Sequence, residues 1–251
     1  MIYPDGLYYK EIFSNGLRNR KGIVYYKNNS IMYDGEFLND MFNGNGKFIY
    51  KNGNYYKGHI TNSCFNGKGI LYSNDNKVIY EGYFVDGKYE GEGKIFYGNG
   101  EYYIGKFVLG LRSGKGIEYY KDNTIKYDGK FLEDKYNNNN GKYIYENGDY
   151  YIGNFSSGKK EGQGIEYYRN NQKKYEGHFS NNKYNGCGKY YYKDNTYYDG
   201  GWENGLRDGE GIICNSDDNV IYAGRFYKGE TATFRSIGSI VINSIIKLLE
   251  N

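Results

Sequence analysis

The chain repeats one short pattern from near its first residue almost to its last, and this repetition limits the folds it can adopt. Each copy opens with a tyrosine, and successive copies start 23 or 24 residues apart. The ten starts are Tyr9, Tyr33, Tyr56, Tyr80, Tyr103, Tyr127, Tyr151, Tyr175, Tyr198 and Tyr222. Such a period predicts an array in which each copy is one supersecondary unit that packs on its neighbours.

The spacing within a copy predicts two β-strands. The second residue after the start is glycine in nine of the ten copies, and two residues further on an aromatic follows in nine, as in Tyr80, Gly82 and Phe84. Residues at alternate positions share one face of a strand, so we expect the glycine to leave room for neighbouring rings. A G-x-x-x-G-x-G corner follows at 87–93. Its glycines should take positive φ or allow close backbone approach.

The copies alternate between two kinds. One kind closes with a two-residue turn such as Asn52-Gly53, which predicts a type I′ hairpin. The other has one more residue, as at 27–30, which predicts a longer, bulged loop. In step with this, Lys47, Lys94, Lys142 and Lys189 alternate with isoleucine, and corner aromatics alternate with Arg18, Arg112, Lys160 and Arg207. An insertion at 137–140, where corner glycines are missing, predicts a local bulge or kink.

The composition indicates how such an array could be packed. The chain has 38 Gly, 35 Tyr, 13 Phe and a single Pro, and few aliphatic residues for a thick core. Tyrosine is the expected substitute, with its ring buried and its hydroxyl in water. We therefore expect an all-β repeat fold over residues 1–230: an elongated, single-layer antiparallel meander of about ten hairpins.

After Gly229 the pattern stops, and residues 231–251 form a separate segment. Its apolar residues predict an amphipathic α-helix that is too short to cross a bilayer. The residues expected on its contact face are Ile237, Ile240, Val241, Ile245, Leu248 and Leu249.

Charge and cysteine content argue against several classes of protein. Lys and Arg total 33 against 30 Asp and Glu, which is not the basic excess of nucleic-acid binding. The cysteines Cys64, Cys187 and Cys214 are odd in number and lack CxxC spacing, so neither disulfides nor zinc are expected, only small packing residues. No signal peptide or membrane span is evident. We expect a soluble, cytoplasmic protein.

No catalytic residue, metal ligand or cofactor site is predicted. The two histidines, His59 and His178, occupy the same repeat position, where other copies carry Glu, Lys, Asn or Arg. A catalytic base is not expected at so variable a position, so both are interpreted as solvated strand residues.

The pattern Y-x-G-x-[FW]-x-x-G-x-x-x-G-x-G, carried at 80–93, 103–116 and 198–211, resembles the MORN repeat (membrane occupation and recognition nexus). The resemblance covers residues 3–230, with Phe where Trp is usual except at Trp202. It implies a single-layer array of antiparallel hairpins, often followed by a helix. It also implies a non-enzymatic scaffold in cytoskeletal, ciliary or membrane-skeleton assemblies.

One face of such an array should keep an apolar groove that binds a peptide or helix of a protein partner. The residues predicted to line it are Phe37, Tyr80, Phe84, Tyr103, Phe107, Tyr127, Phe131, Phe155, Phe179 and Trp202. The open terminal strand and the last helix are further contact sites, and the helix could pair with a second copy to form a homodimer. The alternative function is binding of phosphoinositides or other anionic lipids through Arg18, Arg112, Lys160 and Arg207.

Overall fold

The computed structural model describes residues 8–10, 13–14 and 16–232. Two compact units divide the chain, unit 1 over residues 1–135 and unit 2 over residues 136–251. The division falls inside β14 (Lys135–Tyr136). The described residues contain strands and turns and no helix. Apart from Thr231 and Ala232, the segment predicted to form the C-terminal helix, with its contact residues Ile237, Ile240, Val241, Ile245, Leu248 and Leu249, lies outside the described residues.

Unit 1 is an antiparallel sheet whose strands pair in chain order, with a small two-stranded hairpin of β2 and β3 beside β1 and β4 in the sequence. Its strands are β1 (Tyr8–Lys10), β2 (Phe13–Ser14), β3 (Leu17–Arg18), β4 (Arg20–Tyr25), β5 (Ile31–Leu38), β6 (Met41–Ile49), β7 (Tyr55–Thr61), β8 (Cys64–Tyr72), β9 (Val78–Val85), β10 (Lys88–Phe96), β11 (Tyr102–Val108), β12 (Leu111–Tyr119) and β13 (Ile125–Leu132).

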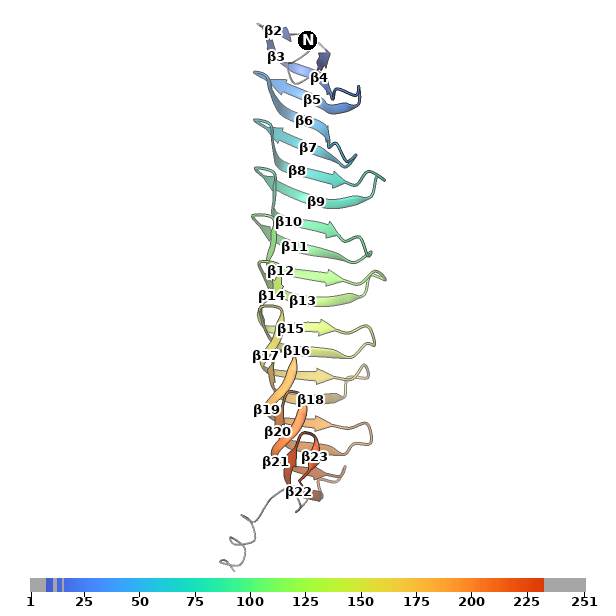
Figure 1. Ribbon diagram of the computed structural model, residues 1–251, viewed down its shortest axis with the longest axis vertical. Helices are drawn as coiled ribbons and strands as arrows, with labels where there is room; N and C mark the ends of the chain where they lie inside the picture. Colours follow the sequence, from blue (N-terminus) through green and yellow to red (C-terminus); the bar gives the residue numbers. More distant parts are fainter. Residues whose placement is uncertain (1–7, 11–12, 15, 233–251) are drawn as a thin grey trace, which may run out of the picture. The chain divides into compact units, whose positions relative to one another are not determined.

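Unit 2 has the same organisation, and Figure 1 shows the strands of each unit following one another side by side. Its strands are β15 (Asn138–Ile144), β16 (Tyr150–Ser156), β17 (Lys159–Tyr167), β18 (Lys173–Ser180), β19 (Lys183–Tyr191), β20 (Tyr197–Glu203), β21 (Leu206–Cys214), β22 (Val220–Tyr227) and β23 (Glu230–Thr231). The predicted all-β antiparallel meander of hairpins is confirmed in both units.

The corners that join the two strands of a copy are type I′ turns, because both central residues have positive φ. At one corner these residues are Asn204 (φ 52°) and Gly205 (φ 87°). The prediction of a type I′ turn at Asn52-Gly53 is wrong, since only Gly53 there has positive φ. Its N–H donates to the carbonyl of Tyr50 at 2.9 Å, in a type I turn closed by one left-handed residue.

The extra residue of alternate copies lies in a strand and not in the loop, so that prediction is also wrong. The loop at 26–30 makes the same two hydrogen bonds as the loop at 50–54. The register instead shifts between Val24 paired with Tyr33 and Tyr25 paired with Ile31, which marks a β-bulge. The same shift recurs in every second copy.

The bulge predicted at 137–140 is confirmed. Strand β15 advances three residues, from Asn138 to Gly141, while β16 advances two, from Phe155 to Gly153. The corresponding stretch of β17 and β18 pairs without a shift. The insertion is therefore accommodated in β15.

The core is a row of tyrosines on one face, which we call the tyrosine face. Eight of them are fully buried: Tyr33, Tyr56, Tyr80, Tyr103, Tyr127, Tyr151, Tyr175 and Tyr198. Tyr80 lies across Gly82 and Gly93, which pair across the strands, and a Cβ on either glycine would collide with its ring or hydroxyl. The expectation that these hydroxyls stay in water is wrong, because each donates to a backbone carbonyl three residues on, as Tyr80 does to Tyr83 at 3.0 Å.

Candidate functional site

A second layer of side chains covers each core tyrosine. It comes from the second residue of the second strand of each copy, which we call the stacking position. In the aromatic copies the rings stack face to face, with centroids 4.0 Å apart for Tyr33 and Phe42, 3.9 Å for Tyr56 and Phe65, 3.7 Å for Tyr80 and Tyr89, and 3.8 Å for Tyr175 and Tyr184. Stacked rings of this kind stabilise the array beyond their buried area.

In the other copies a cation takes the place of the second ring. Arg112 lies 5.5 Å from the ring of Tyr103, and Lys160 lies 5.3 Å from the ring of Tyr151. Where the stacking residue is a cation, the turn of the next copy supplies an acceptor. The side chain of Asp134 accepts from the N–H of Arg112 at 3.0 Å. Asp40 and Asn182 accept from the N–H groups of Arg18 and Lys160 in the same way, at 2.8 Å each, but the N–H of the aromatic Phe42 also donates to Ser63 at 3.2 Å. This contact therefore does not by itself explain the alternation of copies.

On the opposite face the alternating lysines also lie over tyrosines. The Nζ atoms of Lys47, Lys94, Lys142 and Lys189 stand 4.2, 4.1, 4.6 and 3.6 Å from the rings of Tyr55, Tyr102, Tyr150 and Tyr197. These are cation–π contacts on half-exposed surface. Both sides of the sheet therefore repeat with a period of two copies.

The four cations proposed to bind lipid all have partners within the chain. Arg18 pairs with Asp40 at 3.1 Å, Arg112 pairs with Asp134 at 3.1 Å and with Glu118 at 2.9 Å, Lys160 pairs with Glu166, and Arg207 donates to the carbonyl of Gly229 at 2.5 Å. The Arg18 hydrogen bonds lower the pKa of Asp40. The structure thus gives these residues a role in holding neighbouring copies together.

Glu166 is the centre of a buried ionic network in unit 2. Only 7% of its side chain is exposed, and Lys160 pairs with it. The hydroxyls of Tyr184 and Tyr145 donate to it at 2.6 and 2.9 Å, and Lys174 lies 3.9 Å away. Burial by itself would raise the pKa of Glu166, but the charge of Lys160 and these hydrogen bonds outweigh it and the pKa is lowered.

Unit 1 has a matching network around Glu118. Its carboxylate pairs with Arg112 at 2.9 Å and with Lys126 at 3.3 Å, and Lys126 also pairs with Glu101 at 2.9 Å. The analysis of the sequence missed both networks. The sequence does contain a sign of them, because two repeat positions change together from apolar to charged. The apolar pairs are Val24 with Met32, Leu71 with Ile79, and Ile213 with Ile221; the charged pairs are Glu118 with Lys126, and Glu166 with Lys174.

The residues predicted to line a partner groove lie in the core. Phe37, Tyr80, Phe84, Tyr103, Phe107, Tyr127, Phe131, Phe155, Phe179 and Trp202 are between 0 and 8% exposed. The second layer buries them, because each core tyrosine is covered by its stacking residue. They form the floor of the tyrosine face, and any contact with a partner falls to the side chains above them.

Over β6 and β8 of unit 1 those upper side chains are aromatic. Phe42, Phe48, Tyr50 and Phe65 form a cluster with ring centroids 5.1 to 6.4 Å apart, and Tyr50 is 36% exposed. Beside this cluster, a hollow of about 720 Å³ opens between the loops at 26–30 and 50–54. The apolar residues in its wall are Tyr26, Ile31, Met32, Ile49 and Tyr50.

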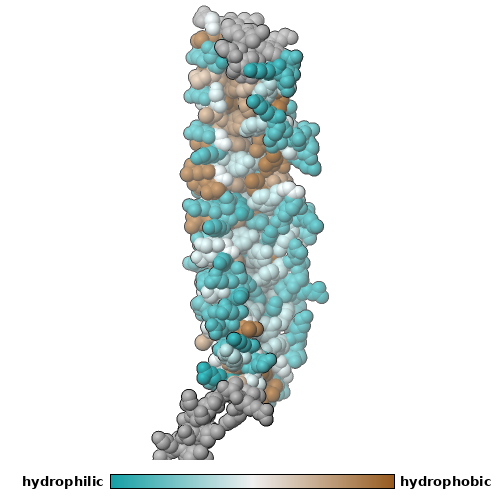
Figure 2. All heavy atoms as spheres, viewed as in Figure 1, coloured by the Kyte–Doolittle hydropathy of each residue, from teal (hydrophilic) through white to brown (hydrophobic). Residues whose placement is uncertain are grey.

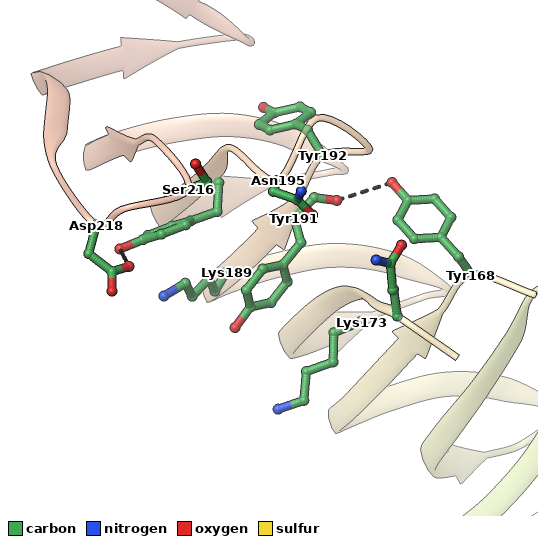
Figure 3. Close-up of a pocket in the computed structure, with 10 residues that line it drawn as sticks. Tyr168, Lys173, Lys189, Tyr191, Tyr192, Asn195, Ser216 and Asp218 are labelled. Carbon is green, nitrogen blue, oxygen red and sulfur yellow. Dashed lines mark hydrogen bonds between the residues drawn. The ribbon is translucent and has the colours of Figure 1, made fainter. Parts of the chain in front are cut away.

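The equivalent place in unit 2 is smaller and polar. Figure 3 shows this hollow of about 370 Å³, with Tyr168 and Tyr191 joined by a hydrogen bond and Lys173 and Lys189 beside them. Lys173 occupies the repeat position of Ile31, and Tyr191 that of Ile49. The array therefore presents the same hollow twice, lined by different chemistry.

The described part of the chain offers little for catalysis or metal binding. No group of three or more His, Cys, Asp or Glu side chains converges there to hold a metal ion. His59 and His178 are exposed strand residues. Cys214 is buried, but Cys64 and Cys187 are exposed, so the prediction that all three pack in the interior is wrong for those two. Within residues 8–10, 13–14 and 16–232 there is no helix with the length and hydrophobicity of a membrane span.

Comparison with known families gives one family. The model of the MORN repeat matches residues 12–31, 33–55, 80–102, 103–125, 127–150, 151–173, 175–197 and 198–220. Seven of these eight segments begin at a tyrosine that starts a copy. The curated proteins include no significant match to the sequence.

Among solved structures, the chain is similar to the TCP domain of Drosophila melanogaster SAS-4 (dCPAP) in complex with a proline-rich motif of Ana2 (dSTIL). The identity is 16%, the TM-score is 0.35, and the match covers 61% of this chain and 81% of that one. It is also similar to a mutant TCP10 domain of Danio rerio CPAP, with 12% identity, a TM-score of 0.30, and coverage of 90% and 98%. These likenesses are too weak to carry an inference about partners.

Proposed function

Because the chain belongs to the MORN repeat family, we propose that it is a non-enzymatic scaffold that binds protein partners through the hollow between the loops at 26–30 and 50–54 of unit 1. The hollow beside Tyr50 is the observation that carries this proposal. The hollow of about 720 Å³ is lined largely by apolar side chains, and exposed apolar hollows commonly mark binding sites. It is large enough to receive apolar side chains of an extended peptide or a helix.

The aromatic side chains of the second layer would offer such a partner an ordered surface. Phe42 stacks on the buried ring of Tyr33 at 4.0 Å and Phe65 on that of Tyr56 at 3.9 Å, so their positions are set by the core. Rings that are already ordered lose little conformational freedom when a partner binds. A partner whose apolar anchor enters the hollow would rest its neighbouring residues on this cluster.

A peptide-display selection against the full chain tests the proposal. The matched variant is Ile31→Lys with Met32→Lys, which copies Lys173 and Lys174 of unit 2 and so uses residues that the same repeat position already accepts. Selected peptides should share an aliphatic or aromatic anchor and bind the variant at least about tenfold more weakly. The control is Lys173→Ile in unit 2, which should leave their binding unchanged. Peptides that bind the wild type and the Ile31/Met32 variant equally would place the binding site elsewhere.

The resemblance to MORN proteins adds where such a scaffold would act: in the cytoplasm, at a cytoskeletal, ciliary or membrane-skeleton assembly. Fluorescence microscopy of the tagged full chain tests this part. A signal spread evenly through the cytosol, with no enrichment at such an assembly, would contradict it.

The alternative, binding of anionic lipid, has less support. Its four cations, Arg18, Arg112, Lys160 and Arg207, have partners inside the chain, and the side chains of the first three are only 12 to 17% exposed. We expect the full chain to remain in the supernatant when phosphoinositide-containing vesicles are sedimented at physiological salt. Cosedimentation that disappears as the salt is raised would favour the alternative.

A further inference from the structure

The last copy of the repeat is incomplete. Its first strand, β22, pairs with β21 along most of its length, but on its other side it pairs only with the two residues of β23, opposite Phe226 and Tyr227. The N–H of Ala232 then donates to the carbonyl of Arg225 at 2.8 Å. No other residue that the structure describes pairs with β22 on this side. We call this side of residues 220–224 the open edge.

The open edge leaves part of the core of the last copy uncovered. Tyr222 occupies the position of the eight fully buried tyrosines, yet it is partly exposed. Its hydroxyl donates to the carbonyl of Arg225 at 3.3 Å, whereas the same bond is 2.8 to 3.1 Å long in those eight copies. Val220 and Ile221 beside it are 58 and 63% exposed, and Figure 2 shows hydrophobic surface at this lower end of unit 2. An exposed apolar strand edge favours the addition of another strand.

The other copies of the same kind show which strand is missing. Strands β5, β9 and β18, like β22, pair with the preceding strand through a bulge, and each is followed by a full second strand. In that second strand a glycine faces the glycine of the first strand, a large apolar residue faces the core tyrosine, and a tyrosine follows two residues later. The residues are Gly46, Phe48 and Tyr50 after β5, Gly93, Ile95 and Tyr97 after β9, and Gly188, Tyr190 and Tyr192 after β18. A strand that completes the last copy needs the same pattern, Gly-x-apolar-x-Tyr.

The chain does not carry this pattern at the position where the missing strand should follow. The glycine lies under the ring of the core tyrosine, and a Cβ on Gly93 would collide with the hydroxyl of Tyr80. In the last copy Arg235 and Ser239 stand where the glycine and the tyrosine are expected, and Gly238 comes three residues late. In the register of the other copies, the chain's own continuation therefore does not fit beside β22.

A second copy of the chain offers no such strand among its described residues either. The strands from β4 to β21 that carry these glycines already pair with a neighbour on both sides. Two β22 edges that met at Gly224 would bring two Tyr222 rings over one pair of glycines, whereas such a pair in the other copies lies under one ring. Neither the chain itself nor a second copy thus supplies the strand in this register.

We propose that the open edge binds an extended segment of another protein, which joins the sheet as an antiparallel strand. The glycine of the segment faces Gly224, its large apolar residue packs against Tyr222 and the exposed Ile221, and its tyrosine faces Val220. Backbone hydrogen bonds supply affinity in this mode of binding, and the alternate side chains supply specificity. The open edge is separate from the hollow between the loops at 26–30 and 50–54, so the proposal does not rest on that site.

Fluorescence anisotropy of a labelled peptide, titrated with the full chain, tests the proposal. The probe copies residues 91–98 (GEGKIFYG), which contain the pattern that pairs with β9. It should bind saturably, and a peptide with Gly93→Val should bind at least about tenfold more weakly, because the new side chain meets Tyr222. The matched control peptide carries Lys94→Val, whose side chain would face Ala223, and should bind like the probe.

Variants of the chain locate the contact. The carbonyl of Arg225 points to the open side, and the N–H of Ala223 does so too, because alternate residues of a strand share their hydrogen-bonding side. Ala223→Pro removes that donor, and Tyr222→Ala removes the ring that the probe packs against, so each should weaken binding at least about tenfold. Tyr227→Ala, at an exposed residue outside the open edge, should leave binding unchanged. Circular dichroism checks that each variant is folded.

Three results would overturn the proposal. The first is absence of probe binding, a probe that binds no tighter than its Gly93→Val form, or unchanged binding to both edge variants. The second is a probe that binds only when the full chain carries Gly238→Val with Ile240→Asp, which would show that residues 233–251 of the same chain cover the edge. The third is a wild type that dimerises in sedimentation velocity and that Ala223→Pro converts to a monomer, which would assign the edge to a second copy.

Discussion

Replacing Glu166 alone should strongly destabilise unit 2. Glu166→Leu removes the partner of Lys160, whose side chain is only 12% exposed, and the acceptor for the hydroxyls of Tyr145 and Tyr184. Removing one member of a buried ion pair costs about 3–5 kcal/mol. Since Lys160 can still donate to the hydroxyl of Tyr145 at 2.8 Å, we expect the lower end, a loss of about 3 kcal/mol.

Replacing the whole network by apolar residues should change the stability of unit 2 very little, because another copy of the repeat carries apolar residues at the same positions. The triple variant is Lys160→Phe, Glu166→Leu and Lys174→Ile, which copies Phe65, Leu71 and Ile79. The surroundings match as well, since Tyr50 and Tyr89 stand at the repeat positions of Tyr145 and Tyr184. Well-packed apolar residues often equal or exceed a buried ion pair in stability, so the triple variant should fall within about 1 kcal/mol of the wild type or above it.

Urea unfolding of the full chain, followed by far-ultraviolet circular dichroism, measures both variants. Repeat arrays unfold in parts, so the transition of unit 2 is compared between variants and no single free energy is assigned to the chain. The reciprocal control is Leu71→Glu, which places a carboxylate among apolar neighbours and should destabilise unit 1. A triple variant as unstable as Glu166→Leu would show that the charged and apolar sets of residues are not interchangeable. If Glu166→Leu does not lower the stability of unit 2, the inference that Lys160 depends on Glu166 is refuted.

Three further results are expected. Gly93→Ala should cost about 2 kcal/mol, because the new Cβ would collide with the hydroxyl of Tyr80, whereas Gly98→Ala, with nothing within 4 Å, should be neutral in the same urea titration. Tyr97→Phe should stabilise unit 1 by about 1 kcal/mol in thermal unfolding, since the buried Tyr97 hydroxyl makes no hydrogen bond of normal geometry; a loss of stability would show that it pairs with the nearby guanidinium of Arg112. The lowered pKa of Glu166 means that its contribution is present above the ordinary value of 4.5 and is lost as the pH falls through the lower folded-state pKa, so the urea midpoint of unit 2 should drop in acid less for the triple variant than for the wild type.

The repeat itself made the fold predictable. Tyrosine, glycine and phenylalanine at alternate positions fix the inward face of each first strand, and the glycine pair such as Gly82 and Gly93 fits only a ring lying across it. The turns were less predictable, because Asn-Gly is compatible with two turn types. The loops at 26–30 and 50–54 form the same turn although a bulge follows only the first, and a bulge changes the register without changing the residues of the turn.

The residues predicted to line a partner groove share one face of the sheet, as expected from their spacing, but they are buried in the core. Sequence periodicity shows which side a residue faces, but not whether another side chain covers it. Phe84 was placed on an open groove because its strand position is inward, yet Tyr89 and its neighbours bury it to 2% exposure. The cations Arg112 and Lys160 were considered available for anionic lipid for the same reason, since spacing within a copy does not show the partners that pair with them. Only a comparison of two repeat positions at once would have shown the networks.

Leu109 is an exception to the residue preference at the first turn position of the repeat. Most of the copies place Asn, Asp or Ser at the first turn position, where a short polar side chain tolerates a left-handed backbone. In natural proteins the local preference of each residue usually matches the conformation that the fold gives it, except at functional sites. In a repeat protein such an exception is easy to see, because the other copies show which residues the position normally carries. Replacing Leu109 by the residue at Asn204 removes the departure without changing the turn. If that change raises the thermal stability of the chain, the leucine is strained in this turn and is not there for the fold; unchanged stability would show that the turn accepts leucine without cost.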